Sequence, residues 1–334
     1  MKISIIHTAE DFLLLKKDWD ILYAQNDYTV FQSFDYCFHS LEEGMLPFVV
    51  ISKENNKIRE IWPCVINQGK LEFINQKHAD FCDILIDSSN SKILQFIIDQ
   101  KEIKRIALKN IREDSKILRV LGRSEYLLIK NEVSYSTLFL EQTDSFPSNF
   151  TQFIYRKRRR LTRILKKYPT GILELLSFPE NDFPLKEIQV LRKKMIDLSV
   201  RKKDFLDATL LNLIKVLYNS NKLKISILKV DNQISAISFF FQRKDEYSFW
   251  IDVFDEKQMI NLYHNTLFIK TITEKQTAIF NFGRGNYLYK NQNFSPNFFP
   301  LFSINIFRNN YNLRFYQLKL ALIIFGKSIF SKIK

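Results

Sequence analysis

The stretch FNFGRGNYLYKNQNF (280–294) is the most informative part of this 334-residue sequence. It places two of the chain's seven glycines, Gly283 and Gly285, on either side of Arg284, directly after an apolar run that predicts a strand. Glycine adopts positive φ and lets the backbone approach a ligand closely. Arg284 offers a planar fork for a phosphate or carboxylate, and Lys290 a compact charge suited to a developing oxyanion. The stretch therefore predicts a binding or catalytic turn, the alternative being a loop that needs glycines only to turn.

The composition is that of a globular protein with a strong positive charge. Hydrophobic residues make up 46% and charged residues 26% of the chain, and the net charge of +14 indicates anionic partners such as phosphates, nucleotides, anionic lipid or RNA. Cys37, Cys64 and Cys82 lack metal-ligand spacing, which predicts reduced thiols in a cytoplasmic protein and no metal site. The N-terminus is not typical of a signal peptide, and no segment has the roughly 20 apolar residues of a membrane span.

Strand and helix patterns predict a mixed α/β or α+β fold with two similar domains. In each half, helices precede short β-branched and aromatic runs separated by polar turns, which is typical of an antiparallel meander. A polar, proline-containing link at 143–150 predicts a border between domains at 1–142 and 143–310. The tail at 311–334 predicts a basic amphipathic helix that packs on the second domain or lies on a membrane surface. The predicted meander strands are 47–53, 58–67 and 70–75, and then 222–230, 233–242 and 246–254.

The segment RKRRRLTRILKK (156–167) carries eight basic residues in twelve. Apolar residues recur at helical spacing through it, so it predicts an amphipathic helix rather than a disordered tail. Its cationic face, including Arg158 and Arg159, is suited to the phosphates of a nucleotide, RNA or anionic lipid. The alternative is a solvated face at the start of a domain, because the run carries no base-reading pattern.

Two further groups of candidate residues lie near predicted strands. Asp80 and Asp83 flank residues that alternate across a strand, so they lie on opposite faces and form no acid–base dyad. Asp83 is a candidate for orienting a substrate amine, or else a strand-edge aspartate. In the second half, Asp252 alternates with apolar neighbours and is suited to face a cleft, with a helix-capping role as the alternative. Its accompanying binding candidates are Trp250, Tyr263, His264 and Asn265.

The opening stretch resembles the strand–turn motif of FemAB-like and CelD-like (BioF2-like) acyltransferases of the GNAT superfamily, roughly F-D-F-G-R-G-x-x-x-Y-K-x-x-F. The resemblance extends more widely, over most of the chain to about residue 300. Two features depart from the family pattern: Asn281 stands where the family has aspartate, and 254–265 contains none of the glycines of an ordinary GNAT pyrophosphate loop. The matching motif residues are Gly283, Arg284, Gly285, Tyr289, Lys290 and Phe294, and the wider resemblance covers 249–256, 155–168, 31–36 and 79–87.

The resemblance implies two tandem GNAT-like domains, with largely antiparallel central sheets flanked by helices and an acyl-donor cleft in the second. It implies transfer of an acetyl or other acyl group from acyl-CoA, without a metal. The implied acceptor is an amine or hydroxyl of a sugar, nucleotide sugar or cell-envelope polysaccharide precursor. Direct attack needs only a positioned nucleophile, proton removal and a polarised carbonyl. Lys290 and Asp252 are the expected catalytic residues, and Arg284 the expected clamp on an anionic group.

Two other functions stay open from the sequence. One is FemX-like aminoacyl transfer from charged tRNA to a peptidoglycan precursor. The basic helix favours this function, whereas the lack of a long coiled-coil insertion, which such enzymes often carry, argues against it. The other is a non-catalytic scaffold on anionic membrane in envelope polysaccharide assembly. We expect no specific nucleic-acid binding, and a cytoplasmic location that allows peripheral contact with the inner face of the membrane.

Overall fold

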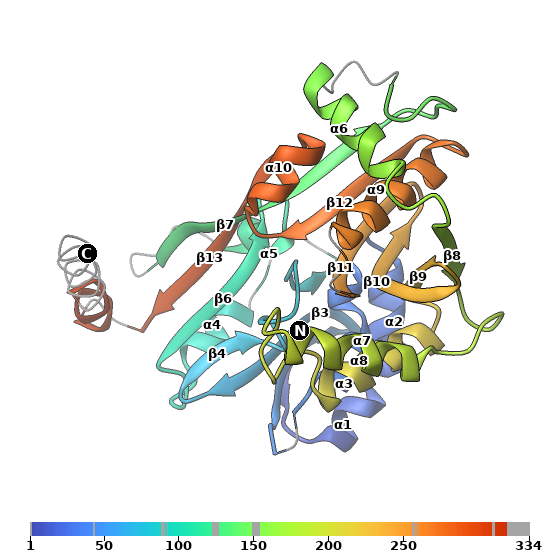
Figure 1. Ribbon diagram of the computed structural model, residues 1–334. Helices are drawn as coiled ribbons and strands as arrows, with labels where there is room; N and C mark the ends of the chain where they lie inside the picture. Colours follow the sequence, from blue (N-terminus) through green and yellow to red (C-terminus); the bar gives the residue numbers. More distant parts are fainter. Residues whose placement is uncertain are drawn as a thin grey trace. The chain divides into compact units, whose positions relative to one another are not determined.

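The computed structural model describes residues 2–42, 44–87, 91, 93–121, 127–148, 154–255, 257, 259–308 and 311–318. The chain forms two compact units (Figure 1). The first comprises Met1–Glu132 together with Leu301–Lys334, and the second comprises Val133–Pro300.

The chain passes between the units inside two long strands, β7 (Leu127–Leu140) and β13 (Asn297–Phe307). The sequence-based borders at 142/143 and 310/311 therefore differ from the unit borders at 132/133 and 300/301. The difference has a physical reason: a strand that continues from one unit into the next shows no change of composition at the crossing. Whether 1–142 and 143–310 behave as separate domains stays a prediction.

A mostly antiparallel sheet forms the centre of the first unit, with strand order β1-β2-β3-β4-β6-β13 and β5 beside β3. The β4–β6 pair is parallel and the remaining pairs are antiparallel. The strands are β1 (Lys2–Ile6), β2 (Pro47–Glu54), β3 (Lys57–Asn67), β4 (Lys70–Phe73), β5 (Leu85–Ile86) and β6 (Arg105–Arg112). The helices are α1 (Ala9–Leu14), α2 (Lys16–Ala24), α3 (Phe34–His39), α4 (Ile93–Ile98) and α5 (Lys116–Val120), with a short 3-10 turn η1 (Val30–Gln32).

The second unit contains a sheet with strand order β7-β12-β11-β10-β9-β8. The β11–β12 pair is parallel, and the other pairs are antiparallel. Its strands are β8 (Ile172–Leu176), β9 (Lys224–Val230), β10 (Gln233–Arg243), β11 (Glu246–Phe254) and β12 (Ala278–Arg284). Its helices are α6 (Tyr155–Leu165), α7 (Leu185–Asp197), α8 (Ala208–Asn219), α9 (Ile260–Thr273) and α10 (Leu288–Phe294).

Both predicted meanders are confirmed, and asparagine-rich turns explain how a glycine-poor chain makes them. Asn55–Asn56 joins β2 to β3, and Asp231–Asn232 joins β9 to β10. These four residues have φ between 50° and 61°. A two-residue type I′ hairpin turn requires positive φ at both positions, and Asn and Asp tolerate it best after glycine. The strand predicted at 79–87 is shorter than expected, with only Leu85–Ile86 in β5.

The described part of the predicted tail helix is helical. Residues 311–318 form a helix, and the Tyr316 ring lies 5.1 Å from the Phe307 ring and 4.7 Å from the Arg105 guanidinium. Phe307 belongs to the predicted second domain and Arg105 to the predicted first, so packing on the second domain and contact with a membrane surface both stay predictions. The remainder of the helix predicted at 311–334 lies outside the described residues.

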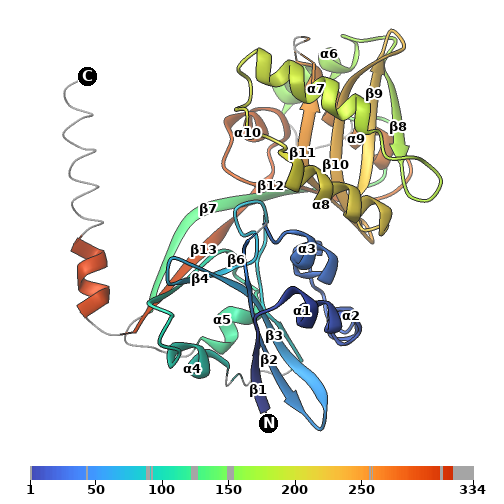
Figure 2. The same ribbon diagram turned by 90° about the horizontal axis from the view of Figure 1, so that it is seen from below.

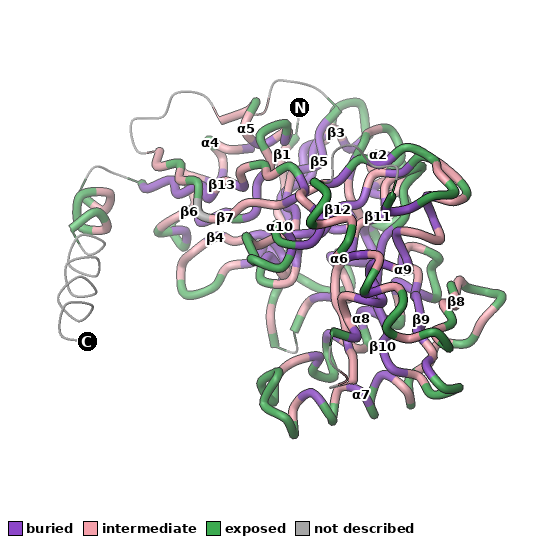
Figure 3. The backbone as a smooth tube through the Cα atoms, turned by 45° about the horizontal axis from the view of Figure 1, so that its top comes forward, coloured by how far each residue is buried: buried purple, intermediate pink, exposed green. Residues whose placement is uncertain are grey.

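Helices cover both faces of the second sheet: α7 and α8 lie on one face, and α9 lies on the other (Figure 2). Buried residues run along β9, β10, β11 and α9 (Figure 3). Helix α9 is buried on most sides because the sheet covers one side and α6 packs on another, through the buried Leu161 and Ile164. The aromatic residues of this core are Phe146, Phe240, Tyr247, Phe249, Phe268, Phe280, Phe282 and Phe294.

Phe268 tests the importance of this core. Its ring is fully buried and lies 4.9 Å from Phe240 and 5.1 Å from Phe249. We expect Phe268→Ala to lower the free energy of unfolding by about 3–5 kcal/mol, because it removes a buried ring and leaves a cavity. Urea unfolding measures this loss. The control is Leu288→Ala, at a side chain that is 77% exposed, which should change stability little.

Candidate active site

The parallel strands β11 and β12 separate towards their C-terminal ends. They pair over Glu246–Ser248 and Ile279–Asn281, although β11 continues to Phe254. On its other edge β12 stays paired with β7 as far as Arg284, opposite Tyr135. Open α/β sheets bind ligands at the C-terminal ends of parallel strands, where the strands diverge. We call this opening between β11 and β12, beyond Ser248 and Asn281, the strand split.

The turn that ends β12 requires its glycines. Gly283 and Gly285 have φ of 65° and 102°. A Cβ atom on Gly285 would lie 2.5 Å from the Tyr287 ring, so a side chain at this position would both strain the backbone and clash. The Gly285 N–H donates to the Ser134 carbonyl at 2.8 Å, which ties the turn to β7.

Asn281 shapes the same turn with both ends of its side-chain amide. Its Oδ1 accepts from the Gly283 N–H at 3.0 Å, and its Nδ2 donates to the Glu246 carboxylate on β11 at 2.9 Å. An aspartate would keep the first bond but would place a second carboxylate against Glu246. An asparagine, in place of the aspartate of the motif that this stretch resembles, therefore suits a position that faces the Glu246 carboxylate.

Lys290 holds the turn from inside. Its side chain is 1% exposed, and its ammonium Nζ donates to the carbonyl oxygens of Gly283, Arg284 and Gly285 at 3.1, 3.2 and 2.9 Å. An ammonium carries three N–H donors, so these bonds direct all three at the backbone of the turn. The predicted role in stabilising an oxyanion stays a prediction, and the structure adds a role in fixing the turn.

Asp252 lies on β11, past the last residue that pairs with β12. The Ser238 hydroxyl donates to its Oδ1 at 2.5 Å, and the Asn261 amide donates to its Oδ2 at 3.2 Å. Burial raises the pKa of Asp252 above that of an ordinary aspartate, while these two hydrogen bonds and the charges of Arg201 and Lys290 act in the opposite direction. A buried carboxylate with an elevated pKa and few partners is the usual setting of a general base.

Tyr289 is the other predicted residue near Asp252. Burial raises the pKa of its hydroxyl, and the Asp252 charge raises that pKa further. Its ring stacks on Tyr287 at 6.1 Å. The charge of Asp252 thus acts on Tyr289, which follows the glycine turn in the chain.

Several other predicted residues have contacts within the core. Tyr263 donates its hydroxyl to the Tyr168 carbonyl at 2.8 Å, and Asn265 is buried on α9. His264 is fully buried with Nε2 3.0 Å from the Ser226 hydroxyl, and burial lowers its pKa to about 3. Trp250 packs against Phe241 with ring centroids 5.2 Å apart. Tyr263, His264 and Asn265 are buried and Trp250 is half-buried; a binding role for each stays a prediction.

Asp83 belongs to the first unit and caps a helix there. Its carboxylate accepts from the backbone N–H groups of Lys116 and Ile117 at 2.7 and 2.9 Å, at the start of α5. Burial raises the pKa of Asp83 to about 6, against the opposing effect of these N–H donors. The capping bonds account for this aspartate without a substrate.

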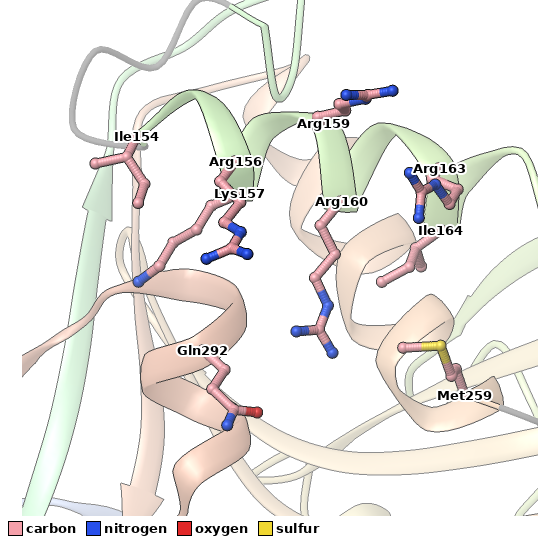
Figure 4. A pocket seen from close by; sticks show the side chains of 9 residues that line it. All are labelled: Ile154, Arg156, Lys157, Arg159, Arg160, Arg163, Ile164, Met259 and Gln292. Carbon is pink, nitrogen blue, oxygen red and sulfur yellow. The ribbon is translucent and has the colours of Figure 1, made fainter.

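A basic cavity of about 750 Å³ lies between α6, α9 and α10 (Figure 4). The Arg160 side chain extends from α6 towards the space between Met259 and Gln292 (Figure 4). The Lys157 ammonium, whose pKa is lowered by burial, joins α6 to α10 by donating to the Asn291 carbonyl at 2.5 Å and to the Ser295 hydroxyl. The cavity is lined by Ile154, Arg156, Lys157, Arg159, Arg160, Arg163, Ile164, Met259 and Gln292.

The sequence named Arg158 and Arg159 as binding residues on this helix, and only Arg159 lines this cavity. Arg158 donates from Nη1 to the Ser148 carbonyl at 3.1 Å, and both arginines line a neighbouring hollow along α6. Arg160 was not singled out. Leu161 and Ile164 are buried and so fix the rotation of α6, which indicates where the neighbouring arginines Arg160 and Arg163 lie. The sequence does not show that α10 forms the opposite wall of the cavity.

Across the described residues, no group of three or more His, Cys, Asp and Glu side chains is placed to hold a metal ion. Within the same residues, no helix combines the length and apolar character needed to cross a membrane. Cys37, Cys64 and Cys82 are buried free thiols.

Solved structures show the same fold. The C-terminal DUF2156 domain of a provisionally named lysylphosphatidylglycerol synthetase from Agrobacterium fabrum matches with a TM-score of 0.60 at 12% identity, over 95% of this chain and 97% of that one. FemX matches with a TM-score of 0.56 at 11% identity, over 95% and 99%. A tandem GNAT protein from the clavulanic acid pathway matches with a TM-score of 0.50 at 6% identity, over 92% and 99%. No family model and no curated protein matches the sequence. At these identities the likeness concerns the fold, which is a mixed α/β fold shared with tandem GNAT proteins.

The Asn281–Glu246 contact generates a direct test of how the turn is held. We expect Asn281→Asp to lower the free energy of unfolding by about 1–3 kcal/mol, because a charged acceptor then faces the Glu246 carboxylate without a donor between them. Adding Glu246→Gln should recover most of the loss, since the new amide can donate to the new carboxylate. Urea unfolding of the two single variants and the double variant gives the coupling energy. Additive losses would show that the two side chains do not interact.

Proposed function

We propose that the second unit transfers an acyl group from acyl-CoA to an amine or hydroxyl of a sugar, nucleotide sugar or polysaccharide precursor. The observation that carries this proposal is the position of Asp252 on β11, past the last residue that pairs with β12, where burial raises its pKa and the charge of Lys290 acts against that rise. The fold shared with a tandem GNAT protein supports it.

The strand split suits a donor with an amide-bearing arm. Where two strands diverge, their facing N–H and C=O groups no longer bond to each other, and an extended chain of amides can take up those bonds as an added strand does. The pantetheine arm of CoA is such a chain. It would bring a thioester carbonyl to the end of β12, near Asp252.

The reaction then needs one base and one placed carbonyl. The acceptor amine or hydroxyl attacks the thioester carbon, its proton passes to the Asp252 carboxylate, and the carbon–sulfur bond breaks to release the thiolate. Asp252 suits this step because burial raises its pKa while Ser238 and Asn261 keep its two oxygens in place. Lys290 contributes by holding the turn that faces the reacting carbonyl, with direct charge stabilisation as its predicted second role.

A second candidate is aminoacyl transfer from a charged tRNA, with the same base and the same split. The observation that favours it is the density of cations on α6, which exceeds what the phosphates of one CoA molecule require. Both candidates break an acyl bond at the same carbon, so they differ in the leaving group and in what binds beside α6.

Asp252 gives the first test of this function. We expect Asp252→Asn to lower turnover by about 100- to 10,000-fold, the usual contribution of a general base. In the unaltered protein, kcat/KM should rise with pH through a pKa above that of an ordinary aspartate, because the base acts only when ionised and burial favours its protonated form. Ser238→Ala removes a bond to the ionised form, so this acid limb should move to higher pH. An acid limb that stays in place in both variants would assign the base to another group.

Lys290 gives the second test. We expect Lys290→Ala to lower turnover by roughly 100- to 1,000-fold with a smaller effect on KM if its charge acts on the carbonyl. Asn281→Asp is the matched control, since it disturbs the same turn and leaves the ammonium in the chain. If the two variants lose turnover and stability in the same proportion, Lys290 acts by positioning the turn alone.

A further inference from the structure

The cavity between α6, α9 and α10 concentrates positive charge without balancing it. Arg156, Arg159, Arg160 and Arg163 have no ion pair with any carboxylate in the described part of the chain, and no acidic residue is among the described residues that line the cavity. Like charges on successive turns of one helix repel each other. An arrangement of this kind is suited to an anionic ligand that supplies the missing charge.

The helix that carries these arginines is fixed in place. Leu161 and Ile164 are buried under it, and the Lys157 ammonium ties it to α10 through Asn291 and Ser295. The arginine side chains therefore start from a defined backbone rather than from a mobile tail. A guanidinium held in this way can meet a phosphate with two parallel hydrogen bonds.

A second hollow of about 560 Å³ borders the first along α6. Arg159 and Arg163 line both hollows, so one ligand can cross the helix while contacting cations throughout. The second hollow is also lined by Tyr155, whose side chain is 70% exposed and offers a ring face for a nucleobase.

The start of α9 provides little alternative for phosphate binding. The residue before the helix, Met259, has φ of 63°, and the segment that leads to it contains no glycine to bring backbone N–H groups close to a ligand. In this chain, arginine side chains from α6 stand beside that helix start.

We propose that the α6 cavity binds two or more adjacent phosphate groups of a nucleotide-bearing donor, with Arg160 as the central contact and the nucleoside reaching the hollow at Tyr155. This inference rests on the proposed function for its choice of donor. The shared chemistry is a nucleotide with closely spaced phosphates, which either CoA or the 3′ end of an RNA supplies.

Binding without turnover tests the inference. Isothermal titration with CoA, with ADP, with a short single-stranded RNA and with phosphatidylglycerol vesicles compares the unaltered protein with Arg160→Gln, Arg160→Lys and Arg163→Gln. The matched control is Lys215→Gln, which removes one charge from an exposed position on α8. A thermal melt of each variant checks that it is folded.

We expect Arg160→Gln to weaken binding by about 10- to 100-fold, the usual contribution of charge-assisted hydrogen bonds. The affinity of Arg160→Lys should lie between those of the unaltered protein and Arg160→Gln, because lysine keeps the charge but loses the planar fork. Lys215→Gln should bind as tightly as the unaltered protein. CoA and ADP binding with this dependence identifies a CoA donor, and RNA binding with it identifies an RNA donor. Binding only to phosphatidylglycerol vesicles, an equal loss in Lys215→Gln, or no binding of any nucleotide would overturn the inference.

The inference and the proposed function can fail separately. Arg160-dependent nucleotide binding by a protein that transfers no acyl group would overturn the function alone. Acyl transfer with an unchanged donor KM in both Arg160→Gln and Arg163→Gln would overturn the cavity assignment alone.

Discussion

The bonds from the Lys290 ammonium to three successive carbonyl oxygens determine how the chain leaves β12. A buried cation is costly unless its donors are satisfied, and the glycine turn presents its carbonyls inward to satisfy them. Helix α10 is thereby attached to the end of β12, and Asn281 fixes the first bend by bonding to Gly283 and Glu246. Asn281 joins β12 to β11 at the last pair of residues before the two strands separate, and the glycine turn begins directly beyond that bond.

The same unit shows how one packing requirement sets the charge pattern. Helix α9 carries buried residues on most of its sides and so requires cover beyond the sheet. Helix α6 provides it with Leu161 and Ile164, and its remaining positions are largely basic. The rotation that buries these two residues turns Arg160 and Arg163 towards the cavity and leaves Arg158 outside it. The cationic surface is therefore a consequence of how the core is closed.

Two titratable residues of this unit differ in how their surroundings act on them. His264 is enclosed by the core beside Ser226, and burial lowers its pKa to about 3. Asp252 is half-buried, and although burial raises its pKa, Ser238, Asn261 and two nearby cations support its ionised form. A carboxylate under such opposing influences exchanges a proton more readily than a fully enclosed imidazole. This contrast separates the two candidates that the sequence had placed side by side.

The sequence by itself determined the features that arise from local rules. Alternating apolar residues gave both meanders, Asn55–Asn56 and Asp231–Asn232 gave their turns, and Gly283 and Gly285 marked the end of β12. Periods of 2 and 3.6 and the demand for positive φ are properties of the backbone, so they are visible along the chain. Tertiary structure alone decided which groups meet. It determined that Lys290 bonds to the turn and that Asp83 caps α5. It also determined that β11 and β12 separate and that the chain passes from one unit to the other inside β7 and β13. Each of these depends on segments far apart in sequence coming into contact, and the identity of a partner across such a contact is not encoded in any local pattern.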